Sequence, residues 1–158
     1  MTDIDGLRER KDACADLVAR FLARAQAASV RVDVVADEAA AEDLIAADRT
    51  ARAARQEQVG VARAAKGIAE TGTCVVVTTD EETRLATMLP ETSVILLRTA
   101  DIVADLPDLA PFLREQQQAV SYVSFITGPS RTADIERVGA IGVHGPLELH
   151  VILLEGVA

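Results

Sequence analysis

Val94-Ile95-Leu96-Leu97 is an uninterrupted apolar run, and continuous or nearly continuous apolar runs occupy residues 74–77, 123–126 and 151–154. Strands that are apolar on both faces are typical of a parallel sheet that helices cover on both sides. Helix-forming segments separate the runs, at residues 81–88, 108–119 and 131–138. This alternation of strands and helices predicts an α/β fold, a three-layer α/β/α sandwich with a mainly parallel sheet.

The amino-terminal part of the chain supplies an amphipathic helix and an edge strand. Apolar residues recur at steps of three and four through residues 5–28, which predicts a helix that packs against a sheet or a partner. Residues 30–35 alternate apolar and charged side chains, as in an edge strand, and Asp37 is placed to cap a helix over residues 38–58. No linker or repeat interrupts the chain, so we expect a single domain over residues 1–158.

Composition and charge narrow the classes of function. The chain has 158 residues, of which 49% are hydrophobic and 26% charged, as is ordinary for one globular domain. Its net charge of -9 argues against a nucleic-acid partner and against binding to an anionic membrane surface. The sequence shows neither a signal peptide nor an apolar run of membrane-spanning length, so we expect a cytoplasmic protein without membrane insertion.

The two cysteines limit the metal and redox chemistry of the chain. Cys14 and Cys74 are too few for a disulfide framework, a structural zinc site or an iron–sulfur cluster held by this chain alone. We therefore expect this chain to bind neither a metal nor a cofactor. The dinucleotide-binding fingerprint, the Walker loop and the nucleophile elbow are also missing from the sequence.

Three glycine-containing segments, each beside an expected strand, are the candidates for a site. The first runs over residues 67–73 and contains Glu70 and the triplet Thr71-Gly72-Thr73. A glycine between two threonines lets the backbone approach a ligand, the hydroxyls can donate to an anion, and Glu70 adds a carboxylate. A turn or bulge stabilised by the threonine hydroxyls is the alternative.

The second segment is Thr127-Gly128-Pro129-Ser130-Arg131-Thr132, which predicts a strand end, a Gly-Pro turn and the start of a helix. Ser130 or Thr132 would cap this helix, the free amides of its first turn would bind an anion, and Arg131 would clamp a carboxylate or phosphate. Arg131 is hard to explain by structure alone, because only five of the sixteen Lys and Arg residues lie in residues 72–158. Asp134 would offset the helix dipole or take part in proton transfer.

The third segment is Gly142-Val143-His144-Gly145-Pro146, before the last strand. His144 would act as a proton donor, as an acid or base, or as a donor that orients a carboxylate; a turn in which its imidazole bonds the backbone is the alternative. A Ser130/His144/Asp134 triad can be written, but no nucleophile elbow supports it. His150, on the last strand, is expected to pair with Glu148.

These considerations give a set of expected site residues. Glu70, Asp134 and His144 are the candidates for proton transfer. The expected ligand-binding residues are Thr71, Gly72, Thr73, Gly128, Ser130, Arg131, Thr132 and Gly145.

Taken together, the three segments resemble the LUD domain, the family of lactate utilization protein C (LutC). The resemblance covers residues 59–158 well and the amino-terminal helix, residues 1–28, loosely. It implies a fold like that of the sugar-phosphate isomerase and CoA-transferase group (NagB/RpiA/CoA-transferase-like), with ligand sites at strand ends. It also leads us to expect a longer segment with a further strand between Asp37 and Val59, where this chain is short.

The resemblance further implies a place in L-lactate utilization. In bacteria, proteins similar to this one belong to a system that oxidises L-lactate to pyruvate, in which LutA-like and LutB-like partners hold the iron–sulfur clusters. This chain would then be a component without a redox centre that binds a small anionic metabolite, and whether it is an enzyme by itself stays open.

Two other functions also stay open. On the same scaffold the chain would be a stand-alone enzyme that handles a sugar phosphate or an acyl-CoA, with Glu70 as the base or nucleophile. Alternatively it would be a scaffold that docks through the apolar face of the helix over residues 1–28.

Overall fold

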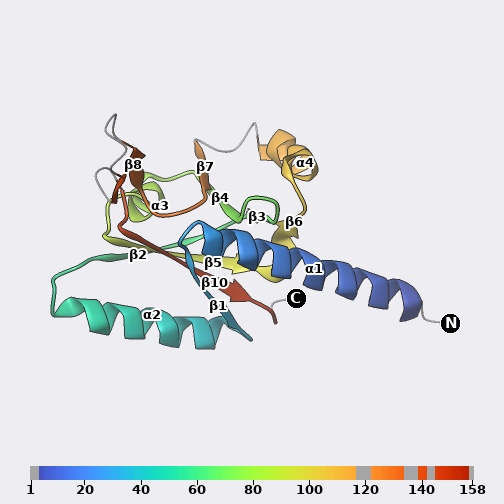
Figure 1. Cartoon of the computed structure of the whole chain (residues 1–158), viewed down its shortest axis with the longest axis horizontal. Helices are drawn as coiled ribbons and strands as arrows, with labels where there is room; N and C mark the ends of the chain where they lie inside the picture. The colour runs from blue at the N-terminus through green and yellow to red at the C-terminus, as the bar shows by residue number, and fades with distance from the viewer. Residues whose placement is uncertain (1–3, 117–121, 134–138, 142–144, 157–158) are drawn as a thin grey trace.

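Figure 1 shows the computed structural model, which describes residues 4–116, 122–133, 139–141 and 145–156. The helices are α1 (Ile4–Ala27), α2 (Glu38–Ala53), α3 (Glu81–Ala86) and α4 (Leu106–Gln116), together with the 3-10 turn η1 (Thr99–Asp101). The strands are β1 (Arg31–Val35), β2 (Val59–Arg63), β3 (Lys66–Ile68), β4 (Thr73–Thr78), β5 (Thr92–Arg98), β6 (Ile102–Val103), β7 (Tyr122–Ile126), β8 (Arg131–Ala133), β9 (Gly139–Ile141) and β10 (Glu148–Leu154).

The central sheet is parallel throughout and has the strand order β1-β10-β5-β2. Its inner strands, β5 and β10, contain two of the apolar runs. The residues of these runs that pack with α1 and the second sheet are Ile95, Leu97, Val151 and Leu153. Those that pack with α2 are Val94, Leu96, Ile152 and Leu154. The predicted α/β fold with a mainly parallel, helix-flanked sheet is confirmed, and β1 is the predicted edge strand.

The other two apolar runs lie in a second sheet, with the strand order β6-β3-β4-β7. Strand β4 is antiparallel to both β3 and β7. Cys74 and Val76 of β4 face the core shared with the parallel sheet, whereas Val75 packs with Leu109 of α4. The run in β4 is thus buried on both faces, which a layered antiparallel sheet also provides, so such burial does not indicate strand direction. The run in β7 is only half-buried, and Phe125 is 48% exposed, so the expected burial on both faces is wrong for residues 123–126.

Helices α1 and α2 lie on opposite sides of the parallel sheet (Figure 1). Helix α1 buries Phe21 and Ala25 completely. Helix α2 is capped as predicted, because the Asp37 carboxylate accepts a hydrogen bond from the Ala40 amide at 2.9 Å. The helix ends at Ala53, before the predicted residue 58. None of the helices in the described part of the chain combines the length and apolar character that a membrane span requires.

The predicted helix over residues 131–138 is wrong at its start. Residues Arg131–Ala133 form β8, which pairs with β9 in an antiparallel two-stranded sheet. Residues 134–138 lie outside the described part of the chain. Pairing with residues 139–141 thus outweighs the local helix preference on which the prediction rested, as tertiary context often does.

Candidate functional site

Threonine hydroxyls join the first two glycine-containing segments. The Thr73 hydroxyl lies 2.7 Å from the hydroxyl of Thr71 and 2.9 Å from that of Thr127. The register of β4 and β7, with Cys74 opposite Ile126, brings Thr73 and Thr127 face to face just beyond the paired strands. Because Thr73 is buried while Thr71 and Thr127 are exposed, these hydroxyls lead from the protein interior to solvent. We call this group of three residues the threonine junction.

A backbone hydrogen bond joins the second segment to the third. The Ser130 amide donates to the Pro146 carbonyl at 3.0 Å. Gly145 lies close to the same residue, since a Cβ atom added at Gly145 would be 3.2 Å from Cβ of Ser130. The described parts of the three segments therefore adjoin, the first with the second and the second with the third.

The other predicted site residues are placed only in part. Arg131 and Thr132 lie on β8. Asp134 and His144 lie outside the described residues. The side chain of Glu70 is exposed in the turn between β3 and β4.

The anion site that we predicted at a helix start does not form at Ser130. The next residue, Arg131, begins a strand, and the Ser130 amide is already bonded to Pro146. The free amides of a first helical turn are therefore not offered by this part of the described chain. The donors at the surface of the threonine junction are instead the exposed hydroxyls of Thr71 and Thr127.

Two of the predicted ligand-binding glycines have structural reasons for lacking a side chain. Gly72 has a φ of 68°, and a Cβ atom there would lie 2.4 Å from the backbone nitrogen of Ala25 in α1. At Gly128, a Cβ atom would lie 3.0 Å from the carbonyl oxygen of Ala28. Both glycines allow close packing against the end of α1, which supports the turn interpretation of the first segment.

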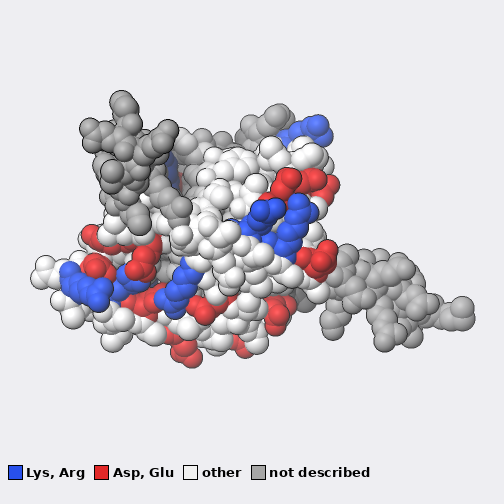
Figure 2. Space-filling model, in the orientation of Figure 1, with Lys and Arg blue, Asp and Glu red and all other residues white. Residues whose placement is uncertain are grey.

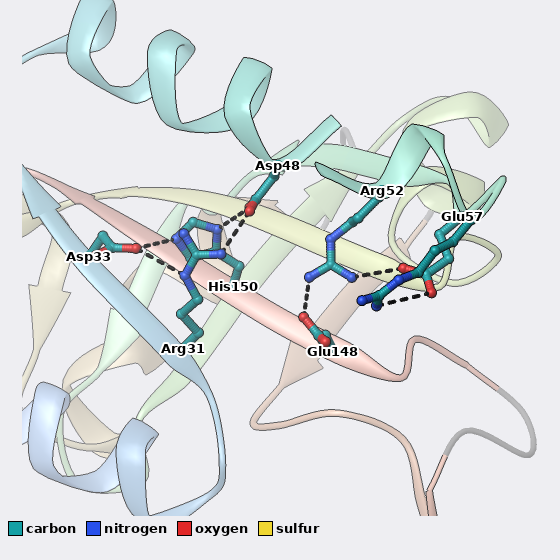
Figure 3. A network of polar contacts seen from close by, with 8 residues as sticks. Arg31, Asp33, Asp48, Arg52, Glu57, Glu148 and His150 are labelled. Atoms are coloured by element: carbon teal, nitrogen blue, oxygen red, sulfur yellow. Dashed lines mark hydrogen bonds and ion pairs between the residues drawn. The ribbon is translucent and has the colours of Figure 1, made fainter. Parts of the chain in front are cut away.

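A buried histidine network, which the motif analysis missed, lies on the α2 face of the parallel sheet (Figure 3). His150 Nδ1 is 2.8 Å from Oδ2 of Asp48, and its Nε2 is 2.9 Å from Oδ2 of Asp33. Arg31 links the two carboxylates, because it donates to Asp48 at 2.7 Å and to Asp33 at 3.2 Å. The register of β1 and β10 places Arg31 directly opposite His150.

The predicted pairing of His150 with Glu148 is wrong. Glu148 forms an ion pair with Arg52 of α2, while His150 contacts Asp48, one helical turn earlier in the same helix. The two side chains share a face of β10, as expected for residues two apart on a strand. Helix α2 crosses above that face and provides a separate partner for each of them.

Burial and charge have opposite effects on Asp48. Burial alone would raise its pKa, but hydrogen bonds from Arg31 and His150 hold the pKa below the ordinary aspartate value. The hydrogen bond to Asp48 is also the main reason that the pKa of Arg31 is raised. The side chains of His150 and Asp48 are only 2% and 9% exposed, so this pair joins α2 to the sheet. The sequence signal that could have predicted this network is the pair of charged residues, Arg31 and Asp33, on an edge strand.

Comparison with known proteins adds sequence relatives. The model of the LUD domain family matches residues 31–154. The chain is 38% identical over 106 residues to the uncharacterized protein YkgG of Escherichia coli (strain K12), covering 65% of this chain and 46% of that protein. It is 35% identical over 106 residues to lactate utilization protein C of Geobacillus thermodenitrificans (strain NG80-2), covering 65% and 44% of the two chains. The chain therefore spans about half the length of the curated relatives it matches.

A solved structure is also similar to this chain. The crystal structure of a DUF162 family protein from Deinococcus radiodurans superposes with a TM-score of 0.59 at 18% sequence identity. The superposition covers 89% of this chain and 98% of the other. At this level of identity the similarity shows a shared fold, in agreement with the α/β arrangement described above.

Proposed function

Since the chain belongs to the LUD domain family, whose model matches residues 31–154, we propose that it acts in L-lactate utilization as a component without a redox centre of its own. Relatives named lactate utilization protein C, 35% identical over 106 residues, support this role. Because the chain spans about half of those relatives, the proposal concerns the function of the shared LUD core.

Electron transfer is assigned to LutA-like and LutB-like iron–sulfur partners. Cys74 is completely buried, and burial raises the pKa of its thiol to about 12, so the thiol stays protonated. The Cys14 thiol lies 3.9 Å from the Thr99 carbonyl, to which it donates. Electrons removed from lactate would therefore pass to cofactors that the partner proteins hold.

The threonine junction is the proposed binding site for the small anionic metabolite. The 2.9 Å contact between the Thr73 and Thr127 hydroxyls carries this proposal, because it joins two segments 54 residues apart and leaves hydroxyls at the surface. A hydroxyl donates to a carboxylate oxygen and also accepts from a substrate hydroxyl, so this group suits a hydroxy acid such as L-lactate.

Charged residues close to the junction in the sequence complete the proposed site. Arg131, which follows Ser130 on β8, would supply the positive charge that holds the anion. Glu70 is exposed beside Thr71 and would exchange a proton with the ligand, together with His144 or Asp134.

Lactate-dependent growth tests this proposal. A strain that depends on this protein for growth on L-lactate would receive either Arg131→Ala or Arg49→Ala. Arg131→Ala is expected to abolish growth on L-lactate and to leave growth on glucose unchanged. Arg49→Ala is the matched control, because it removes an exposed arginine of α2. Normal growth on lactate with a folded Arg131→Ala protein would overturn the proposed anion site.

A further inference from the structure

A cleft opens at the carboxyl ends of the parallel strands, on elements other than the threonine junction. It consists of two cavities of about 470 Å³ and 290 Å³, which share Glu38, Arg63 and Leu96 in their walls. Strands β2, β5 and β10 end here, at Arg63, Arg98 and Leu154. Cavities of this size are typical of small-molecule sites.

The topology of the sheet also favours a ligand at this cleft. The connection after β1 leads into α2 on one face of the sheet, whereas the chain after β2 and β5 continues into β3 and β6 of the second sheet on the other face. In open α/β sheets, ligands bind outside the carboxyl ends of the strands where successive connections diverge in this way.

The larger cavity, which we call the apolar lobe, has mainly aliphatic walls. They come from α2, β2, β4 and β5 and include Ala41, Ile45, Val61, Ala62, Val77 and Leu96. Glu38, Glu42, Arg63 and Thr83 complete this lining. A short hydrocarbon chain would find apolar contacts along the six aliphatic side chains of this lining.

The smaller cavity, which we call the cationic lobe, contains Arg63 and Arg98 together with Glu38 and Asp101. Asp101 accepts from Arg98 Nε at 2.6 Å and from Lys66 Nζ at 2.8 Å, so one carboxylate faces two cations. Basic side chains on the face shown in Figure 2 lie beside acidic ones. The lining itself has two arginines and two carboxylates, and Lys66, which contacts Asp101 from outside the lining, adds one positive charge beside it.

Arg98 has hydrogen-bond donors that are available to a ligand. The side chain is 49% exposed and uses its Nε on Asp101. Its two terminal nitrogens make no hydrogen bond or ion pair with the described residues. A guanidinium with two parallel N–H donors matches the geometry of a carboxylate.

Arg63 is held by an ion pair that is open to solvent. Two of its nitrogens donate to the two oxygens of Glu38, at 2.7 Å and 2.6 Å, where the cationic and apolar lobes meet. The two side chains are 60% and 40% exposed. An exposed ion pair contributes little stability and can exchange one carboxylate for another.

We propose that this cleft binds a small organic carboxylate with an unbranched apolar chain of a few carbons. The carboxylate bonds the terminal nitrogens of Arg98 and competes with Glu38 for Arg63. The hydrocarbon chain lies in the apolar lobe, along Val61 and Leu96. The residues of this cleft are separate from those of the threonine junction, where lactate is proposed to bind.

Titration of the full chain with acetate, butyrate, hexanoate and 1-hexanol at fixed ionic strength tests the proposal. Hexanoate is expected to bind saturably, with a Kd at least about tenfold below that of acetate, because each buried CH2 group strengthens binding several-fold. Butyrate should fall between the two, and 1-hexanol should bind more weakly than hexanoate. Equal affinity for all three acids, or no saturable binding, would overturn the proposal.

Two cleft variants and a matched control locate the bound carboxylate. Arg98→Gln is expected to raise the Kd for hexanoate about tenfold, the loss of one charge-assisted contact. Glu38→Gln should lower that Kd by about threefold, because it frees Arg63 from its competitor. Arg49→Gln, outside the cleft, should change nothing. An unchanged Kd in both cleft variants contradicts the proposal.

Methyl NMR of the wild-type chain gives an answer that requires no variant. Hexanoate is expected to shift the methyl signals of Val61 and Leu96, which line the apolar lobe. Shifts at Thr71, Thr73 and Thr127 in their place would overturn the cleft assignment. Failure of the lactate-growth test with these methyl shifts intact would overturn only the proposed function.

Discussion

His150 on β10 and Asp48 on α2 are 102 residues apart in the chain, yet their side chains meet at 2.8 Å inside the protein. Arg52, one turn further along α2, forms an ion pair with Glu148, two residues earlier on β10. The two contacts together fix the direction in which α2 crosses the first half of β10. Helix α2 has few large apolar residues with which to do so, since it buries Ala41 and Ile45 in the core between helix and sheet and packs the half-buried Leu44 against them.

Asp48→Asn is expected to lower the free energy of unfolding by about 3 kcal/mol, because it removes the buried carboxylate that neutralises Arg31 and bonds His150. Urea denaturation measures the change. Asp43→Asn, at an exposed position of the same helix, is the control and should stay within about 0.5 kcal/mol of wild type. Equal effects of the two substitutions would show that the network does not hold the helix.

The stability of the protein should fall in acid, in part through Asp48. Its pKa is lowered in the folded protein, so the unfolded chain binds the proton more readily. The stabilisation is complete above the ordinary aspartate pKa and is lost as the pH falls through the lowered folded value. Between about pH 6 and about pH 3, wild type should therefore lose more unfolding free energy than Asp48→Asn.

Asp101 contributes in the same direction, because Lys66 and Arg98 lower its pKa despite the opposing effect of burial. Wild type and Asp48→Asn both retain Asp101, so the contribution of Asp101 cancels from the difference between their pH profiles. Parallel profiles would mean that the Asp48 carboxylate gains nothing from Arg31 and His150.

Gly72→Ala is expected to destabilise the protein by about 2 kcal/mol or more. The residue has a φ of 68°, and the added methyl group would lie 2.4 Å from the backbone nitrogen of Ala25. Thermal and urea unfolding measure the loss, and Glu70→Ala in the same turn serves as an exposed control. A stable Gly72→Ala protein that binds lactate poorly would restore a ligand-binding role for this glycine.

The layers of the fold could be predicted from the sequence because a strand that is buried on both faces consists of consecutive apolar residues. The runs at residues 94–97 and 151–154 are apolar on both faces, and the structure places them in the two central strands. The antiparallel pairing of β4 could not be predicted in this way, because its run is buried equally well between two layers. Local propensity failed at Arg131, where a strand partner replaced the expected helix.

The sequence indicated which segments form the candidate site, but it did not indicate which of their residues are in contact. The meeting of Thr73 with Thr127 depends on the β4–β7 register, and that of Ser130 with Pro146 on a chain reversal. The partners of His150 lie 102 and 117 residues away, so spacing within the strand pointed to the wrong carboxylate. The cleft at the carboxyl ends likewise joins residues from separate strands, and none of them forms a sequence motif.

Thr73→Val separates the structural and binding roles of the threonine junction. Thr73 is 4% exposed, and its hydroxyl lies between those of Thr71 and Thr127. Valine has nearly the same shape, and the two outer hydroxyls can turn to water, so the free energy of unfolding should fall by only about 1 kcal/mol.

Binding should weaken as well, because Thr127 loses the neighbour that orients its hydroxyl. We expect the Kd for L-lactate, measured by calorimetry, to rise about threefold or more in Thr73→Val and to return toward wild type in Thr73→Ser. The serine variant restores the hydroxyl and thereby controls for the change in packing. If Thr73→Val binds lactate as wild type does, the hydroxyls serve the turn alone, and the proposed lactate site has to be sought elsewhere on the LUD core.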